Sequence, residues 1–354
     1  MSLPLSHSLN IAPLSSTFNN TSATYKFYWL LAIIESLEEG KSEIGKKELF
    51  ARMLTNSWYT VNYFHISFGN QDLIQRAIKN ISKNETIPIN IKKHNLLHLL
   101  LNSPHKKTNN ILKHFDKNVP HRFLTPWIGR SKEENDTQYC KRIISESQQF
   151  SNQTLYALFP DRIYINPIWI NYLTNNAKIL KDYCYWNLSG FLQVRNPNVP
   201  NIQGKLIKPP MRSTLFNQRK NFWDIVFREL GTIDCIYTGV PLSIQKYALD
   251  HFIPHAFVSH DLIWNLVPIS VSFNSVKSDM LPEINLYFDK FYKIQKTAFE
   301  IVSQNNPKSK LLEEYINLFG KEQHEFDFGY EKFKEIISPL ISIARNNGFE
   351  YLER

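Results

Sequence analysis

Five side chains between residues 250 and 277 have the types and spacing needed to hydrolyse a phosphate ester. Asp250 and His251 are adjacent, and Asn265, Asn274 and Lys277 follow His251 by 14, 23 and 26 positions. A carboxylate and an amide oxygen suit a hard cation such as Mg²⁺. Imidazole has an unperturbed pKa that suits a general base near neutral pH. A base that activates water, beside a metal that stabilises the developing charge, predicts phosphodiester hydrolysis.

Two strands and one short helix are predicted to carry these side chains. Residues 244–254 and 265–270 are rich in β-prone residues, and residues 270–280 are predicted to form a short helix capped by a serine. A further β-prone run, at 233–239, ends in a Thr-Gly turn. The order strand, strand, helix describes a hairpin with a long loop, followed by a helix.

This hairpin and helix would bring the polar side chains to one point. Asp250 and His251 close the first strand, and Asn274 and Lys277 share a helix face because they are three residues apart. Asp250 and Asn274 can offer oxygens to one metal ion, and Lys277 can lie beside a phosphate. Each residue alone has an ordinary explanation, such as a core histidine, a turn asparagine or a solvated lysine. Their joint occurrence at these offsets favours an active site.

The pattern resembles the HNH, or ββα-metal, endonuclease family, and in particular the HNH domain of RNA-guided CRISPR effector nucleases. The shared features are D-H-x-x-P at 250–254, the two asparagines, and Lys277 in a K-S-D run before Pro282. The resemblance covers roughly 50 of the 354 residues. It implies that His251 is the general base and that Asp250 and Asn274 hold one Mg²⁺ or Mn²⁺. It also implies that the Asn265 amide bonds the loop backbone and so holds the histidine.

Zinc is a separate question in such domains, because many relatives carry a structural C-x-x-C pair near the start. Here Cys235 is followed by Thr238 at the second cysteine position, so no structural zinc is predicted. His255 and His260 could join His251 in a zinc site by residue type alone. Their place on a strand that enters a loop favours the alternative, in which they line the loop or contact DNA.

The charge of the chain predicts a polyanionic partner. Lys and Arg outnumber Asp and Glu by 41 to 32, a net charge of +9. Residues 79–142 hold thirteen Lys and Arg against five acids, and residues 205–228 are also basic. The bland interpretation of 79–142 is a solvated lysine-rich face, and the functional one is a surface that follows phosphates. Residues 231–282 are not basic, so nucleic-acid binding is expected elsewhere in the chain.

The fold class predicted from these patterns is α+β, in three parts. Residues 1–200 are expected to be a mainly helical region that binds DNA or a partner. Residues 201–285 are expected to be the HNH nuclease domain with a basic, proline-containing linker, and residues 286–354 a helical extension. A hydrophobic fraction of 43% is typical of a folded chain. Helices are predicted at 25–39, 46–57, 71–81, 93–101, 136–150, 176–194, 214–230, 283–302, 309–319 and 329–347.

The remaining features concern the compartment. The three cysteines are far apart, which argues against a disulfide framework and favours a reducing cytoplasm. The N-terminus lacks the charged and apolar regions of a signal peptide. The longest apolar run near it, at 27–34, is too short to span a bilayer, so no membrane association is expected.

The function predicted from the sequence is a metal-dependent HNH endonuclease that hydrolyses DNA, with a role in antiphage defence or restriction suggested by analogy. One site cuts one strand, so a homodimer or a partner protein is implied if both strands are cut. Two alternatives stay open. One is an RNase or a nicking enzyme of a mobile element, and the other is an inactive HNH fold that binds DNA or serves as a scaffold subunit.

Overall fold

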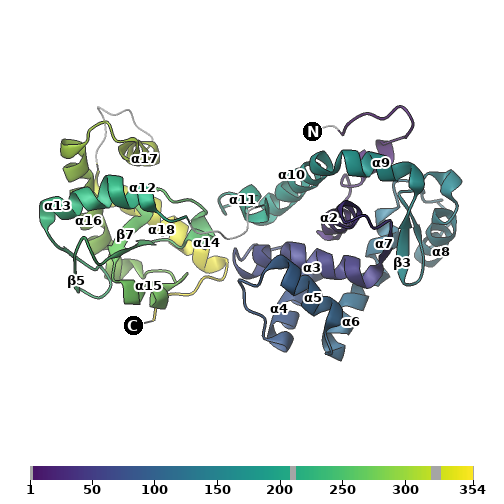
Figure 1. The fold of residues 1–354 in the computed structure, drawn as a ribbon, viewed down its shortest axis with the longest axis horizontal. Coiled ribbons are helices and arrows are strands. Elements are labelled where there is room, and N and C mark those ends of the chain that lie inside the picture. The colour runs from purple at the N-terminus through teal and green to yellow at the C-terminus, as the bar shows by residue number, and fades with distance from the viewer. Residues whose placement is uncertain (1–2, 208–212, 320–327, 354) are drawn as a thin grey trace. The chain divides into compact units, whose positions relative to one another are not determined.

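The chain forms two compact units, and each is described by itself. The computed structural model describes residues 3–207, 213–319 and 328–353 (Figure 1). Unit 1 comprises residues 1–197 and 202–209, and unit 2 comprises residues 198–201 and 210–354. Unit 2 therefore contains the expected C-terminal extension and most of the nuclease region expected at 201–285, whereas residues 202–209 of that region belong to unit 1. Within the described residues, no helix is both long and apolar enough to cross a lipid bilayer.

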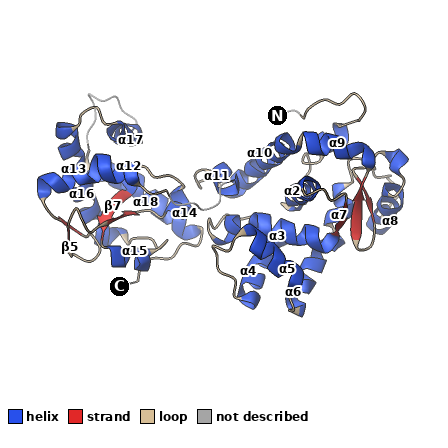
Figure 2. Cartoon of the chain, viewed as in Figure 1, coloured by secondary structure: helices blue, strands red, loops and turns tan. Residues whose placement is uncertain are grey.

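Unit 1 is mainly helical, with one small sheet (Figure 2). Its antiparallel sheet has the order β1-β3-β2, formed by β1 (Glu43–Gly45), β2 (Tyr156–Leu158) and β3 (Arg162–Ile165). Its helices are α1 (Ala12–Ser16), α2 (Tyr25–Glu38), α3 (Lys46–Asn62), α4 (Leu73–Glu85), α5 (Lys93–Asn102), α6 (Lys106–His114), α7 (Val119–Phe123), α8 (Asp136–Ser147), α9 (Pro167–Asn175), α10 (Ala177–Arg195) and α11 (Ile202–Ile207).

Helix α2 forms the centre of unit 1. Its residues 27–34 are apolar on all sides of the helix, and every one of them is buried. A helix of that kind must be enclosed, and here α2 lies between α3 and α10 and contacts both (Figure 1). The apolar run at 27–34 is thus the core of a globular unit. Trp29 donates from its indole N–H to the Tyr156 hydroxyl at 3.0 Å, which ties this helix to the sheet.

Unit 2 is built around the hairpin of β6 (Ala248–His251) and β7 (Leu266–Ile269). The other strands, β4 (Ile233–Asp234) and β5 (Pro241–Leu242), form a separate antiparallel pair. The helices are α12 (Phe216–Gln218), α13 (Asp224–Leu230), α14 (His255–Val258), α15 (Val271–Lys277), α16 (Ile284–Asn305), α17 (Lys310–Phe319) and α18 (Tyr330–Asn346), with a π-helical turn at Arg219–Trp223 and a 3₁₀ turn at Ile263–Asn265.

The C-terminal helices pack on the hairpin directly. The Phe252 ring, just after β6, stacks on the Phe291 ring of α16 with 3.8 Å between centroids. Gln295, also on α16 and fully buried, donates to the Leu266 carbonyl of β7 at 2.7 Å. Stacked aromatic rings and a buried, satisfied amide fix the position of a helix against a hairpin. Residues 286–354 therefore pack against the hairpin as part of unit 2.

The α+β class is confirmed, and the helices predicted from periodicity are found within a few residues of their expected ends. The helix predicted at 214–230 is the least regular, because the π-helical turn interrupts it between α12 and α13. The expected linker is in part the helix α11, whose Lys205 is buried. Residues 208–212, which include part of that linker and the basic residue Arg212, lie outside the described residues.

Candidate active site

The hairpin places Asp250 and His251 at one end of β6. In the antiparallel register, Asp250 faces Val267 and His251 faces Leu266. All four residues of β7 are buried, and Asp250 is only 7% exposed. The first strand predicted for the motif is thus confirmed, and its acidic residue lies in the interior rather than on the surface. A carboxylate so placed requires a compensating charge or ligand.

Lys277 supplies that charge. Its Nζ lies 2.7 Å from Asp250 Oδ2 and donates a hydrogen bond of 2.7 Å to the His251 carbonyl. The Lys277 side chain is fully buried. One ammonium group therefore holds the acid and the backbone of the following histidine together. Lys277 was expected to lie beside a phosphate. Its ammonium is instead buried, and both of these contacts are with residues of the chain itself.

The His251 ring is held from the loop between the two strands. Its Nε2 lies 2.9 Å from Asp261 Oδ1, and since a carboxylate accepts, this nitrogen carries the proton. The hydrogen bond from His251 is the main reason that the pKa of Asp261 falls to about 2. The histidine and the acid form a charge-assisted pair, with Asp261 ionised at neutral pH. This acid was not among the residues predicted from the sequence.

The loop that carries Asp261 is fixed by residues outside the motif. Gln218 of α12 donates from Nε2 to the Asp261 carbonyl at 3.0 Å. Glu314 of α17 accepts a hydrogen bond from the Ile263 backbone N–H at 2.5 Å. These two contacts come from elements on either side of the hairpin in the sequence. They limit the movement of the loop, and with it the movement of the Asp261 carboxylate.

Asn265 bonds the loop backbone in the way the resemblance implies. Its Oδ1 accepts from the Ile253 N–H at 2.8 Å, and its Nδ2 donates to the Ile253 carbonyl at 2.8 Å. The Asn265 carbonyl also accepts from the Phe252 N–H at 2.7 Å. Asn265 is completely buried. Three hydrogen bonds therefore fix the two residues that follow His251.

Asn274 lies on α15, one turn before Lys277. The helix begins with Ser270 as N-cap, whose hydroxyl accepts from the Phe273 N–H at 3.3 Å, as predicted. Helix α15 contacts β6, so Asn274 and the Asp250–Lys277 pair belong to neighbouring elements. The Asn274 side chain is partly exposed and makes no hydrogen bond to another described residue. Its amide is therefore available to an external ligand.

The donor set suits a hard divalent cation. Asp250 Oδ2 is buried and forms an ion pair with the Lys277 ammonium at 2.7 Å, which keeps the carboxylate ionised. That oxygen and the Asn274 amide oxygen are the kinds of ligand that Mg²⁺ and Mn²⁺ take. Among the described residues, no three His, Cys, Asp or Glu side chains gather as metal ligands. The alternative zinc site through His251, His255 and His260 does not form in this part of the chain.

The other two histidines of the loop lie close to the same acid. His255 Nε2 is 3.9 Å from Asp261 Oδ1, and the His255 ring lies 5.2 Å from the His251 ring. His260 packs against Trp264. Burial, aided by the charges of His251 and His255, lowers the pKa of His260 to about 4. His260 is therefore neutral near pH 7.

The comparison with known families identifies the same segment. Residues 235–283 match the sequence model of a family described as HNH endonuclease. The matched segment starts at Cys235 and ends just after the K-S-D run, so it contains all five residues of the site. No curated protein and no solved structure matched the chain.

Proposed function

Because residues 235–283 form an HNH-family domain, and this family is described as HNH endonuclease, we propose that the protein is a metal-dependent endonuclease that hydrolyses DNA phosphodiester bonds. The observation that carries the proposal is the arrangement around Asp250. A buried carboxylate adjoins a histidine whose ring is held by an acid and whose carbonyl is held by a buried lysine. Such positioned groups are what general-base hydrolysis requires.

In this mechanism His251 is the general base, and Asp250 and Asn274 hold Mg²⁺ or Mn²⁺. The metal, when bound, stabilises the negative charge that develops on the phosphate and the leaving oxygen. Lys277 positions rather than reacts, because its ammonium fixes Asp250 and the His251 carbonyl. Asn265 keeps the turn after His251 in place through its two bonds to Ile253.

Asp261 belongs to the same mechanism as a positioning residue. Its carboxylate accepts a hydrogen bond from the Nε2–H of His251. The other ring nitrogen, Nδ1, is therefore the one left to take a proton from water. The ionised acid also stabilises the imidazolium that forms when the base takes that proton. Gln218 and Glu314 hold the loop of Asp261 from outside the matched segment.

The biological setting follows by analogy with the family alone. We propose a cytoplasmic protein in antiphage defence or restriction. One chain has one such site and cuts one strand, so cleavage of both strands would need two chains or a partner protein. These statements concern the assembly and the role, and the active-site chemistry does not depend on them.

The test is cleavage of supercoiled plasmid by the purified full chain in Mg²⁺, Mn²⁺ or EDTA. We expect nicked or linear product that requires metal, and loss of cleavage in His251→Ala, Asp250→Ala and Asn274→Ala. His94→Ala is the matched control, because His94 is exposed on α5 of unit 1. Full activity in any of the three site variants would contradict the assignment of roles.

A parallel reaction on a labelled RNA separates the two nucleic acids. Cleavage of RNA alone, with the same dependence on His251, would keep the nuclease and overturn the DNA substrate. Each variant is compared with the wild type in a thermal melt, so that loss of activity is not confused with loss of folding.

A further inference from the structure

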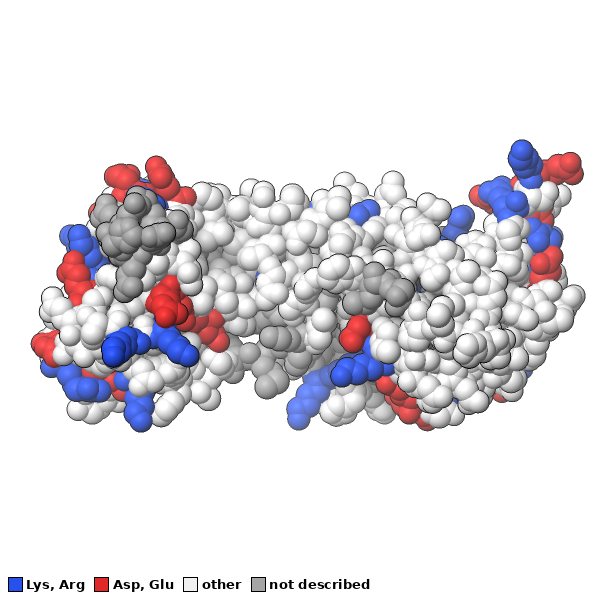
Figure 3. All heavy atoms as spheres, turned by 90° about the horizontal axis from the view of Figure 1, so that it is seen from above, with Lys and Arg blue, Asp and Glu red and all other residues white. Residues whose placement is uncertain are grey.

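The cations of unit 1 differ in how far acids neutralise them. Arg142 lies 2.5 Å from Glu134 and 3.1 Å from Glu146, and Arg130 lies 2.8 Å from Asp136. Such close pairs leave little net positive charge for a polyanion. Figure 3 shows the same feature on one face, where basic and acidic side chains stand next to each other. Cations that can bind a polyanion are therefore those without a close acidic partner.

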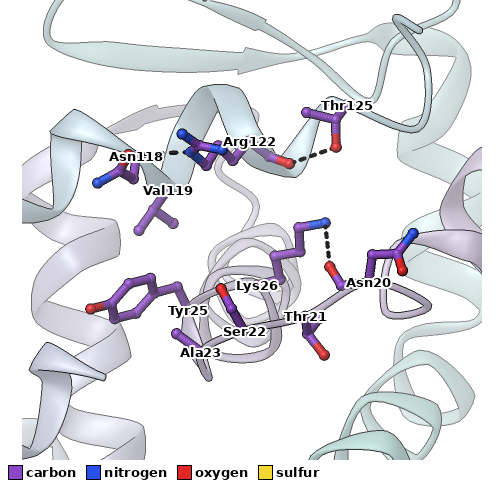
Figure 4. A pocket seen from close by; sticks show the side chains of 10 residues that line it. All are labelled: Asn20, Thr21, Ser22, Ala23, Tyr25, Lys26, Asn118, Val119, Arg122 and Thr125. Carbon is purple, nitrogen blue, oxygen red and sulfur yellow. Dashed lines mark hydrogen bonds between the residues drawn. The ribbon is translucent and has the colours of Figure 1, made fainter. Parts of the chain in front are cut away.

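Two basic side chains meet in a pocket where no acidic side chain is part of the lining. Lys26 of α2 and Arg122 of α7 project into a cavity of about 230 Å³ (Figure 4). The rest of the wall is hydroxyl, amide and apolar: Asn20, Thr21, Ser22, Ala23, Tyr25, Asn118, Val119 and Thr125. Figure 4 shows the Lys26 ammonium turned toward the side of the pocket that carries Arg122 and Thr125.

The two cations in this pocket keep their charge available. Lys26 Nζ donates to the carbonyls of Thr17 and Asn20 at 3.1 and 3.5 Å, which are neutral acceptors. Burial and then the charge of Arg122 lower the pKa of Lys26, as expected where positive charge is not neutralised. Arg122 forms only a long ion pair with Asp136, at 4.0 Å, and Asp136 lies closer to Arg130, at 2.8 Å. An anion in this pocket would therefore gain two cationic partners.

A second basic pocket adjoins the first. It has a volume of about 310 Å³, and no acidic side chain is part of its lining. Its basic groups are Arg76 of α4 and His114 of α6, with Asn80 and Asn110 as amides. Tyr25 lines the first pocket, and Leu73 and Phe115 line the second. The Tyr25 hydroxyl accepts from the Leu73 N–H at 2.8 Å, and the Tyr25 ring lies 5.7 Å from the Phe115 ring. These three residues therefore form the wall between the pockets.

Asp72, the acid that precedes Leu73 in the sequence, is occupied by hydrogen bonds. Asp72 is 4% exposed and accepts from the Thr24 N–H and hydroxyl, each at 2.6 Å, and from the Ile74 N–H at 2.9 Å. Burial raises the pKa of Asp72, so its charge is less available than that of a solvated carboxylate. Asp72 therefore supports the N-terminus of α4 without closing either pocket to anions.

We infer that these two pockets bind neighbouring phosphates of a DNA backbone, with the Tyr25–Phe115 pair as the ridge between them. The inference rests on the proposed function, since it identifies the part of unit 1 that holds the substrate. The contacts are with phosphates and carry no base sequence. Tyr25 is fixed on its hydroxyl and on its ring edge, so it separates the pockets and does not stack on a base.

Binding to a short labelled DNA duplex, measured by fluorescence anisotropy over a salt series, tests this inference. All proteins carry His251→Ala, so that no DNA is cut. We expect Arg122→Gln and Arg76→Gln each to weaken binding severalfold, and Lys26→Gln/Arg122→Gln to weaken it about tenfold or more. The slope of log affinity against log salt should become shallower by about 0.9 for each phosphate that the variant no longer neutralises.

Lys107→Gln/Lys117→Gln is the matched control. Both lysines are exposed, belong to the basic stretch 79–142 and line neither pocket. The double variant removes two positive charges, as many as Lys26→Gln/Arg122→Gln does. Its affinity should stay within about threefold of the parent. Equal weakening in the control and the pocket variants would overturn the inference in favour of diffuse charge. Arg122 and Arg76 are exposed, so their single variants test the inference even if Lys26→Gln disturbs folding.

Competition with inorganic phosphate and with adenosine 5′-monophosphate separates a backbone site from a nucleotide site. Weak competition by both supports the inference. Displacement of the duplex by micromolar monophosphate would overturn it, because the pocket would then select a free nucleotide. A failure of the nuclease assignment is distinguishable, since it appears in plasmid cleavage and leaves this binding measurement unchanged.

Discussion

His251 Nε2 and Asp261 Oδ1 lie 2.9 Å apart, although the acid comes from the loop between the strands and is not part of the motif. If Asp261 orients the base, Asp261→Asn should lower kcat by roughly 10- to 100-fold with little change in KM. The residual activity should be higher in Asp261→Glu, which keeps the charge. Steady-state cleavage of a labelled duplex measures both constants.

The opposite outcome has a definite meaning. If the acid restrained the base in an inactive position, Asp261→Asn would raise kcat, and the positioning role would be wrong. Asp234→Asn is the matched control, because Asp234 is an exposed acid of the same unit, one residue before the matched segment. It should leave both constants unchanged.

The Asp250–Lys277 pair leads to a prediction about stability. Lys277→Met should lower the free energy of unfolding by about 3–5 kcal/mol, because it leaves a buried carboxylate without its counter-charge. Urea denaturation in EDTA measures the change. Lys246→Met, at an exposed lysine of the same unit, should change stability little. The double variant Asp250→Asn/Lys277→Met should cost less than the sum of its single variants, and strict additivity would show that the pair is not coupled.

His260 leads to a prediction about pH. Its pKa falls to about 4 in the folded chain, mainly through burial, whereas the unfolded value is about 6.5. The unfolded state therefore binds the proton first, and stability should decline as pH falls from about 6.5 to about 4. In His260→Gln that decline should be smaller, by on the order of 1–3 kcal/mol. Parallel pH profiles of the two proteins in urea titrations would show that His260 is not the cause.

Metal binding should be visible without any activity. A ligand that binds only the folded state stabilises it, by about 2.7 kcal/mol at 100 times its Kd. Mg²⁺ or Mn²⁺ should therefore raise the Tm of the wild type relative to EDTA. The rise should vanish in Asp250→Ala and shrink in Asn274→Ala, while Asp234→Ala should keep it. An equal rise in Asp250→Ala would place the metal elsewhere.

The local part of the site followed from the sequence because it depends on short-range patterns. Asp250 and His251 end a strand, Ser270 caps a helix, and Asn274 precedes Lys277 by one turn. Strand pairing and helix periodicity over 30 residues leave few ways to arrange such a segment. The helices of both units were predictable for the same reason.

Contacts between distant residues were decided by the tertiary structure alone. Lys277 could have faced a phosphate, and only packing of α15 on β6 shows that its ammonium is buried against Asp250. Asp261 was not predicted as a site residue, because a single acid in a loop carries no periodic signal. Gln218 and Glu314 brace that loop from 43 and 51 residues away. Sequence patterns report local backbone preference, whereas partners at such separations are selected by the packing of the whole unit, which no short pattern records.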